Sequence, residues 1–170
     1  MAKNATLIVK GPLLGQGAVC EPILRALPDW FGIEEAVQQY VRDIEMLPTL
    51  LAFVDDEVVG FLTLKQHTPY AWEIHVMGVR PETHHRGVGR ALVERAEAYL
   101  RDKDAEYLQV KTLSAAHPDE GYARTRRFYR AMGFRPLQEF PTLWGEANPC
   151  LQMIKSLEAS RQNRQKENYA

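Results

Sequence analysis

A segment near the middle of the chain combines glycines with basic and aromatic nitrogen donors in a spacing that suits an anion. Residues His84–Arg90 read His-His-Arg-Gly-Val-Gly-Arg and lie between an expected strand and an expected helix. Gly87 and Gly89 let the backbone come close to a ligand. The first turn of a helix offers amides without an intrahelical acceptor, together with the positive end of the helix dipole. The segment therefore predicts a phosphate or pyrophosphate site.

Two better-known phosphate patterns do not fit this segment. The dinucleotide pattern G-x-G-x-x-G needs a third glycine where Leu92 stands, and no Gly-Lys-Ser/Thr follows as in a P-loop. On this segment alone, a tight strand-to-helix turn without a ligand stays open as the alternative.

The elements that must position this turn follow from hydrophobic periodicity. The predicted helices are Ala18–Leu27, Ile33–Leu47, Gly87–Arg101 and Asp119–Met132. The predicted strands are Thr6–Val9, Thr49–Val54, Val58–Lys65, Ala71–Val79, Tyr107–Leu113, Phe134–Phe140 and Cys150–Ile154. The apolar stripe of the second helix is Ile33, Val37, Tyr40, Val41 and Ile44. This order of elements predicts a mixed α/β sheet.

Composition excludes several classes of protein. The chain has 170 residues, with 21 Lys and Arg against 22 Asp and Glu. This size predicts one domain, over residues 1–157, followed by a polar and frayed tail over 158–170. The charge balance argues against nucleic-acid binding, although an Arg-rich helix over Arg124–Arg130 keeps that alternative open. No apolar run reaches the roughly 18 residues of a membrane span, and Met1–Lys10 lacks signal-peptide character, so we expect no membrane association and a cytoplasmic location.

Two distant segments resemble the GNAT superfamily of N-acetyltransferases. The stretch His84-His85-Arg86-Gly87-Val88-Gly89 resembles motif A, a strand followed by Q/R-x-x-G-x-G/A and a helix, with His84 where Gln or Arg is usual. The stretch Arg127–Phe134 resembles motif B, a helix with Tyr129 four residues before Gly133. Tyr122 stands where the family often has Asn. The resemblance covers about Leu50–Ile154.

The resemblance implies a fold and a reaction. The fold is α/β (α+β): a mixed, mostly antiparallel sheet with a splay between two central strands, Trp72–Val79 and Tyr107–Leu113, and helices on both faces. The reaction is direct transfer of an acetyl group from acetyl-CoA, as cosubstrate, to a primary amine of a small molecule through a ternary complex, without a metal. The alternatives are a non-catalytic acyl-CoA-binding or sensor module and a protein N-acetyltransferase. A homodimer is a further possibility.

The resemblance also implies which residues contact the coenzyme. The pantetheine arm would lie along the backbone of the strand before the glycine turn, and the pyrophosphate on the turn itself. Arg126 would reach the ribose 3′-phosphate and Tyr122 would flank the coenzyme. The full set is Met77, Gly78, Val79, His84, His85, Arg86, Gly87, Val88, Gly89, Arg90, Tyr122 and Arg126.

An acceptor ammonium must lose a proton before its nitrogen can attack, and the departing thiolate benefits from gaining one. Glu73 is the first candidate for the base and His75 its rival, since alternation places both on one face of a strand. His117 is a weaker third candidate. Tyr129 is the candidate acid, and a backbone N–H near Met77 or Gly78 is the candidate oxyanion donor.

The cysteines and the histidine spacing indicate neither a nucleophile nor a metal site. Cys20 and Cys150 are expected to be reduced and buried, so we do not expect Cys150 to be a nucleophile. The histidines show no zinc-type spacing. Five aromatic residues are predicted to line the acceptor site: Trp30, Phe31, Tyr70, Trp72 and Trp144. Glu73 and Glu146 would attract a cation, but no residue distinguishes an amino acid, a polyamine, an antibiotic or a protein N-terminus.

Overall fold

The computed structural model describes residues 5–157, which contain four α-helices and seven strands. The predicted tail over 158–170 lies outside the described residues. The chain divides into two compact units, the first made of residues up to Lys65 with Ile74–Ala96, and the second of Gln66–Glu73 with residues from Glu97 onward. The mixed α/β class with mostly antiparallel strands is confirmed. A single domain over 1–157 stays a prediction.

The first unit contains the N-terminal strands and three of the helices. Its elements are β1 (Leu7–Leu13), α1 (Gly17–Arg25), α2 (Glu34–Met46), β2 (Thr49–Val54), β3 (Glu57–Gln66), most of β4 (Ala71–Val79), the short 3₁₀ helix η1 (Pro81–Thr83) and most of α3 (Val88–Arg101). Its strand order is β1-β2-β3-β4, with antiparallel pairing of β1 with β2 and of β2 with β3. Asp55 and Asp56, with φ of 48° and 68°, make the two-residue turn of the β2–β3 hairpin.

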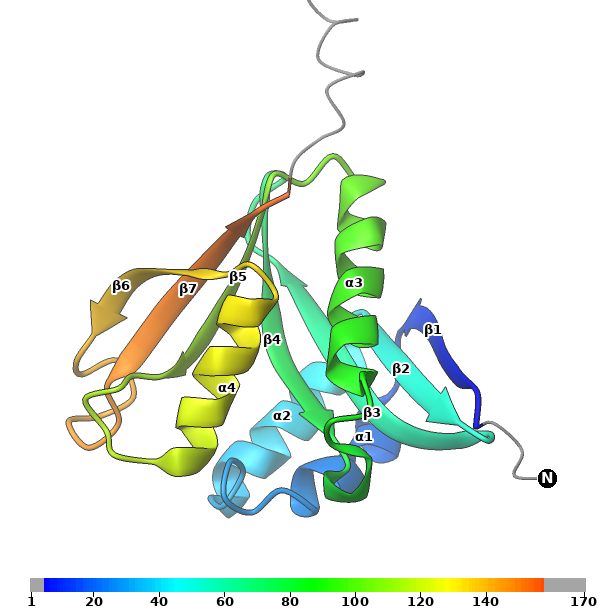
Figure 1. Ribbon diagram of the computed structural model, residues 1–170, viewed down its shortest axis with the longest axis horizontal. Helices are drawn as coiled ribbons and strands as arrows, with labels where there is room; N and C mark the ends of the chain where they lie inside the picture. The colour runs from blue at the N-terminus through cyan, green and yellow to red at the C-terminus, as the bar shows by residue number, and fades with distance from the viewer. Residues whose placement is uncertain (1–4, 158–170) are drawn as a thin grey trace, which may run out of the picture. The chain divides into compact units, whose positions relative to one another are not determined.

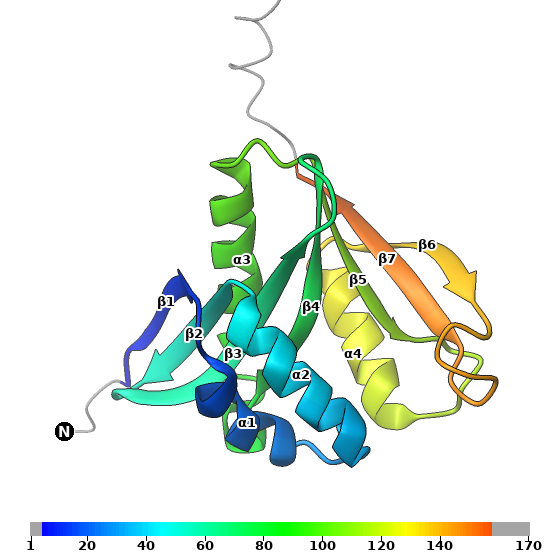
Figure 2. The same ribbon diagram turned by 180° about the vertical axis from the view of Figure 1, so that it is seen from behind.

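Helices cover both faces of the strands in the first unit (Figures 1 and 2). Phe61 on β3 is fully buried in a core cluster with Ile23 of α1 and Ile44 of α2. Gly60, the preceding residue, faces the other way, as alternation requires. A Cβ at Gly60 would lie 2.9 Å from Val88 Cγ1, in the first turn of α3. The absence of a side chain at Gly60 therefore allows α3 to begin directly against β3.

The segment between α1 and α2 differs from its prediction. Ile33 is 63% exposed, because it is the extended residue before α2 and its side chain is not part of the helical stripe. Val37 and Ile44 are buried as predicted. Trp30 and Phe31 are partly buried and pack against the core cluster. Their burial anchors the turn between the two helices.

The second unit is built from β5 (Tyr107–Leu113), α4 (Glu120–Ala131), β6 (Arg135–Phe140) and β7 (Cys150–Ser156). Its strands lie in the order β5-β7-β6, and both pairs are antiparallel. The Asp119 side chain accepts a hydrogen bond from the Tyr122 amide and caps the start of α4. At the other end Lys155 Nζ donates to the carbonyl of Met132, at 2.6 Å. Both ends of the motif B helix are therefore fixed by side chains.

Replacing Gly60 with alanine is predicted to destabilise the protein by about 1–3 kcal/mol, because the added methyl group overlaps Val88. Lys65→Ala, at an exposed position of the same strand, is the matched control and should change the free energy of unfolding by less than about 0.5 kcal/mol. Urea unfolding of both variants measures the difference. Equal stabilities would show that α3 does not depend on this close approach.

Candidate functional site

The turn between β4 and α3 places backbone amides without an intrahelical partner at the start of a helix. The first backbone bond of α3 joins the Ala91 amide to the Gly87 carbonyl, at 3.0 Å. The helix therefore offers no backbone carbonyl to the amides of Val88, Gly89 and Arg90, which come before Ala91 in the chain. Gly87 has a φ of +80°, and nothing lies within 4 Å of the position of a Cβ there. Backbone conformation, not lack of space, thus accounts for glycine at position 87.

Three basic side chains near this turn face solvent, and a fourth, His84, is bonded to the backbone. His85, Arg86 and Arg90 are exposed. His84 Nε2 lies 2.8 Å from the carbonyl of Val79, so this nitrogen donates to the end of β4 and ties the turn to the strand. Together the free amides and the exposed donors fit an anionic group such as a pyrophosphate.

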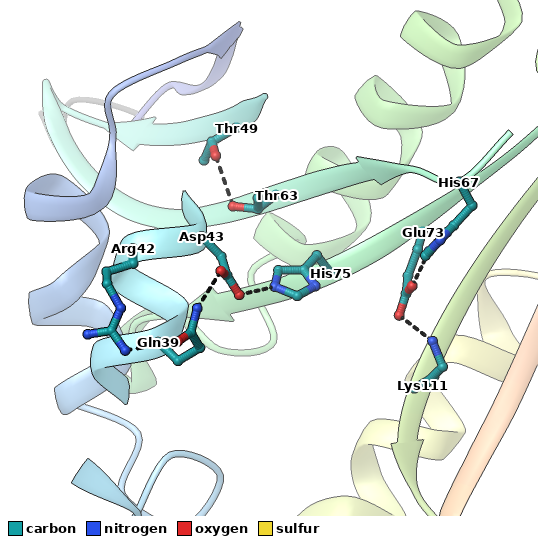
Figure 3. A network of polar contacts seen from close by, with 9 residues as sticks. All are labelled: Gln39, Arg42, Asp43, Thr49, Thr63, His67, Glu73, His75 and Lys111. Carbon is teal, nitrogen blue, oxygen red and sulfur yellow. Dashed lines mark hydrogen bonds and ion pairs between the residues drawn. The ribbon is translucent and has the colours of Figure 1, made fainter. Parts of the chain in front are cut away.

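One polar cluster links β4 to α2 (Figure 3). His75 Nε2 lies 2.8 Å from Asp43 Oδ2. The other carboxylate oxygen, Oδ1, accepts from Gln39 Nε2 at 2.8 Å, and Gln39 Oε1 accepts from Arg42 Nη2 at 2.9 Å. The Tyr40 ring packs edge-on to the imidazole, with 5.8 Å between centroids. The imidazole is thus held by a carboxylate on one side and by an aromatic ring on another.

A second polar cluster surrounds Glu73, which lies two residues before His75 on β4 (Figure 3). Glu73 is only 6% exposed. Its Oε1 lies 3.0 Å from Lys111 Nζ, and its Oε2 lies 2.5 Å from His67 Nε2. Both oxygens of the predicted base are therefore bound to side chains of the second unit. Glu73 is therefore a buried ion-pair partner of Lys111 and His67.

The motif B helix buries two of the predicted site residues. Tyr129 is 5% exposed, and burial, with a smaller contribution from Tyr122, raises the pKa of its phenol well above the ordinary value. The hydroxyl therefore stays protonated at neutral pH and is able to donate a proton. Arg126 is 7% exposed, and its Nη1 donates to the carbonyl of Leu113 at 2.7 Å. Arg126 thus joins α4 to the end of β5.

The five aromatic residues predicted to line the acceptor site have different surroundings. Trp72 is 6% exposed and packs edge-on to Tyr99, as a core residue does. Tyr70 and Trp144 are exposed, by 60% and 42%. Trp30 lies edge-on to His84, with 6.5 Å between ring centroids, and so borders the glycine turn.

Sequence reasoning missed the partners of both clusters. His75 lies 32 positions from its partner Asp43. Glu73 lies 6 positions from His67 and 38 positions from Lys111. The only local signal is the pair Gln39 and Asp43, which share one face of α2 at a spacing of four residues. Pairing across elements depends on the tertiary fold, and the periodicity of one segment does not contain it.

Both cysteines are free and buried. Burial raises the pKa of the Cys20 thiol to about 12. Burial also raises the pKa of the Cys150 thiol to about 11, with Glu73 adding to the shift and Lys111 opposing it. Both groups are therefore thiols at neutral pH, which agrees with the structural role expected for Cys150.

Among residues 5–157, no group of three or more His, Cys, Asp or Glu side chains is arranged to hold a metal ion. None of the helices in the same range has the length and apolar character needed to cross a bilayer.

The chain belongs to the acetyltransferase (GNAT) family, whose model matches residues 22–134, more than half of the sequence. This match includes both the glycine turn and the motif B helix, so the family predicted from those two segments is confirmed. The GNAT fold is confirmed as well. An aminoglycoside 6′-N-acetyltransferase complexed with coenzyme A matches with a TM-score of 0.69 at 18% identity, over 89% of this chain and 97% of that one.

Two curated relatives are similar in sequence. An uncharacterized N-acetyltransferase of Chlorobaculum tepidum is 26% identical over 119 residues, or 68% of this chain and 66% of the relative. A mycothiol acetyltransferase of Beutenbergia cavernae is 34% identical over 94 residues, or 53% of this chain and 30% of the relative. The matches thus span about two thirds and about one third of these relatives.

The raised thiol pKa values predict slow labelling of the native protein. The thiolate is the reactive form, so raising the pKa lowers the reactive fraction at a given pH. At about pH 8, Ellman's reagent should therefore modify neither Cys20 nor Cys150 in the folded protein, and both in denaturant. A native thiol that reacts as fast as a small-molecule thiol would contradict the burial described for it.

Glu73→Gln is predicted to lower the free energy of unfolding by about 2–4 kcal/mol, because it removes a buried carboxylate that Lys111 and His67 both contact. Glu57→Gln, at an exposed position, is the control and should stay within about 0.5 kcal/mol of the wild type. Urea unfolding compares the two. A wild-type stability for Glu73→Gln would show that the ion pair contributes nothing.

Proposed function

We propose that the protein is an acetyl-CoA-dependent N-acetyltransferase that transfers an acetyl group directly to the primary amine of a small molecule. The observation that carries the proposal is the glycine turn: three amides in the first turn of α3, beside exposed Arg86 and Arg90, on a GNAT-family chain. Bound there, the coenzyme would supply an acetyl thioester as the acyl donor.

The coenzyme would be held mainly by backbone groups of this chain. The amides of Val88, Gly89 and Arg90 would donate to the pyrophosphate, with His85 and Arg86 as side-chain donors. The backbone of β4 at Met77–Val79 would bind the pantetheine arm. His84 would act indirectly, because its Nε2 is bonded to Val79 and fixes the turn.

His75 is the better placed of the two base candidates. A general base needs a lone pair that can reach the acceptor nitrogen. Both oxygens of Glu73 are already bonded to cationic or N–H groups. His75 keeps 19% of its side chain exposed and uses only Nε2 on Asp43, so Nδ1 is the nitrogen left to take a proton. In this scheme Glu73 serves as a buried ion-pair partner.

Tyr129 would supply the proton for the departing thiolate. Its raised pKa keeps the phenol protonated until a strong base forms next to it. Burial also keeps water away from the hydroxyl, so the proton would pass to the reacting group.

The proposal of a small-molecule acceptor is supported by the curated relative that is 34% identical over 94 residues, because its name, mycothiol acetyltransferase, refers to a small molecule and not to a protein. Within this chain, the exposed aromatic rings of Tyr70 and Trp144 offer surface to an amine that carries apolar groups. The two free thiols suit a reducing compartment, so we place the reaction in the cytoplasm.

The proposal is tested by calorimetric titration with acetyl-CoA, followed by a panel of amines with released thiol as the signal. Micromolar binding with thiol release on one amine is expected. Failure to bind any acyl-CoA would contradict the proposal. Binding without release on any amine, including peptide N-termini, would favour the non-catalytic acyl-CoA-binding module.

His75→Gln should lower kcat/KM for the amine by about 10²–10⁴-fold, since the proton acceptor is lost, with little change in acetyl-CoA affinity. Steady-state kinetics with the amine found in the panel measures this loss, and His67→Gln provides a histidine control outside the proposed proton path. A larger loss in folded Glu73→Gln than in His75→Gln would return the base role to Glu73.

Tyr129→Phe should lower kcat about ten- to a hundredfold while leaving acetyl-CoA binding intact, because only the donated proton is removed. Phe128→Leu, a neighbouring ring change without a hydroxyl, is the control for packing. Wild-type kcat in Tyr129→Phe would assign the tyrosine to the core alone.

A further inference from the structure

We propose that Asp43 on α2 is a positioning residue that fixes the tautomer of His75, with the proton on Nε2 and the lone pair on Nδ1. This inference rests on the proposed function for its catalytic consequence, but the tautomer itself can be measured without any substrate. Neither the predicted motifs nor the family match assigns a role to Asp43.

The tautomer follows from the partner of Nε2. An ionised carboxylate only accepts hydrogen bonds. With Asp43 Oδ2 at 2.8 Å, His75 Nε2 must therefore carry the hydrogen. In a neutral imidazole the other nitrogen, Nδ1, then holds the lone pair. Asp43 thereby selects the nitrogen that is able to accept a proton from an acceptor ammonium.

The carboxylate is itself oriented by its second oxygen. Gln39 Nε2 donates to Asp43 Oδ1 at 2.8 Å, and Gln39 is oriented in turn because its Oε1 accepts from Arg42 Nη2 at 2.9 Å. Each donor and acceptor in this chain has one compatible assignment. The order Arg42, Gln39, Asp43, His75 thus runs along one face of α2 to β4, all within the first unit (Figure 3).

Packing restricts the imidazole as well. The Tyr40 ring lies edge-on to His75 at 5.8 Å between centroids, with 65° between the ring planes. The side chain of His75 is 19% exposed and that of Asp43 is 28% exposed. The pair is therefore partly shielded from water. In such surroundings a hydrogen bond to a carboxylate fixes the orientation of an imidazole better than it does on an open surface.

Asp43→Asn is the informative variant because it keeps the shape and changes the donor pattern. An asparagine has one acceptor oxygen, whereas both Gln39 Nε2 and His75 Nε2 donate to Asp43 in the wild type. One of these two donors must then face the new NH₂ group. The conflict is relieved when His75 moves its proton to Nδ1 and accepts at Nε2, which is the wrong tautomer for the proposed base.

The test is ¹⁵N NMR of protein labelled at histidine. The spectrum of His75→Gln assigns the His75 signals, because these signals are missing from it. The spectra are compared at a pH at which they show the His75 imidazole to be neutral. Wild-type His75 is expected to show a protonated Nε2 and an unprotonated Nδ1. Asp43→Asn is expected to shift His75 toward the Nδ1–H form, and Asp43→Glu to restore the wild-type form in part. Glu35→Gln, on the exposed side of α2, controls for the loss of a helix carboxylate.

A wild-type His75 protonated at Nδ1, or an unchanged tautomer in Asp43→Asn, would overturn the inference. Kinetics then tests its consequence: kcat of Asp43→Asn should fall about ten- to a hundredfold, with KM for acetyl-CoA within about twofold of the wild type. An Asp43→Asn enzyme with wild-type kcat would refute the positioning role. Absence of turnover in the wild type would count against the proposed function alone, because the NMR result stands independently.

Discussion

The close approach of α3 to β3 at Gly60 is the constraint on which the proposed anion site depends. Val88, whose Cγ1 would lie 2.9 Å from a Cβ at position 60, is also the first residue of α3 and carries the first of the three amides proposed to bind the pyrophosphate. The packing of one methyl group and the direction of those amides are therefore set by the same contact. Gly87 and the His84–Val79 hydrogen bond complete the turn from the side of β4.

Strand β4 gives two neighbouring titratable residues different surroundings. Glu73 is enclosed by Lys111 and His67, and His75 is held by Asp43 and bordered by Tyr40. Alternation alone makes them equivalent, because both point to the same face of the strand. Their partners come from different elements. Both carboxylate oxygens of Glu73 are bonded to side chains, whereas the imidazole of His75 is bonded to Asp43 through Nε2.

The sequence allowed most of the fold to be predicted and only part of the site. The strands Ala71–Val79 and Tyr107–Leu113 have their predicted bounds, because the alternation of apolar and polar residues marks their extent. Ile33 was misplaced because apolar spacing does not show where a helix begins. The glycine turn was local enough to be found from its residue types. The Asp43–His75 pair was not, because it joins residues that only the packing of α2 on β4 brings together.

The most direct measurement is a ¹H–¹⁵N correlation spectrum of the protein titrated with coenzyme A, following the amides of Val88, Gly89 and Arg90. These three signals should shift early and saturate with the calorimetric affinity, because their N–H groups are proposed to donate to the pyrophosphate. Amides of β1 should remain unchanged. Saturable binding that leaves the first turn of α3 unperturbed would contradict the account, since the coenzyme would then be held elsewhere.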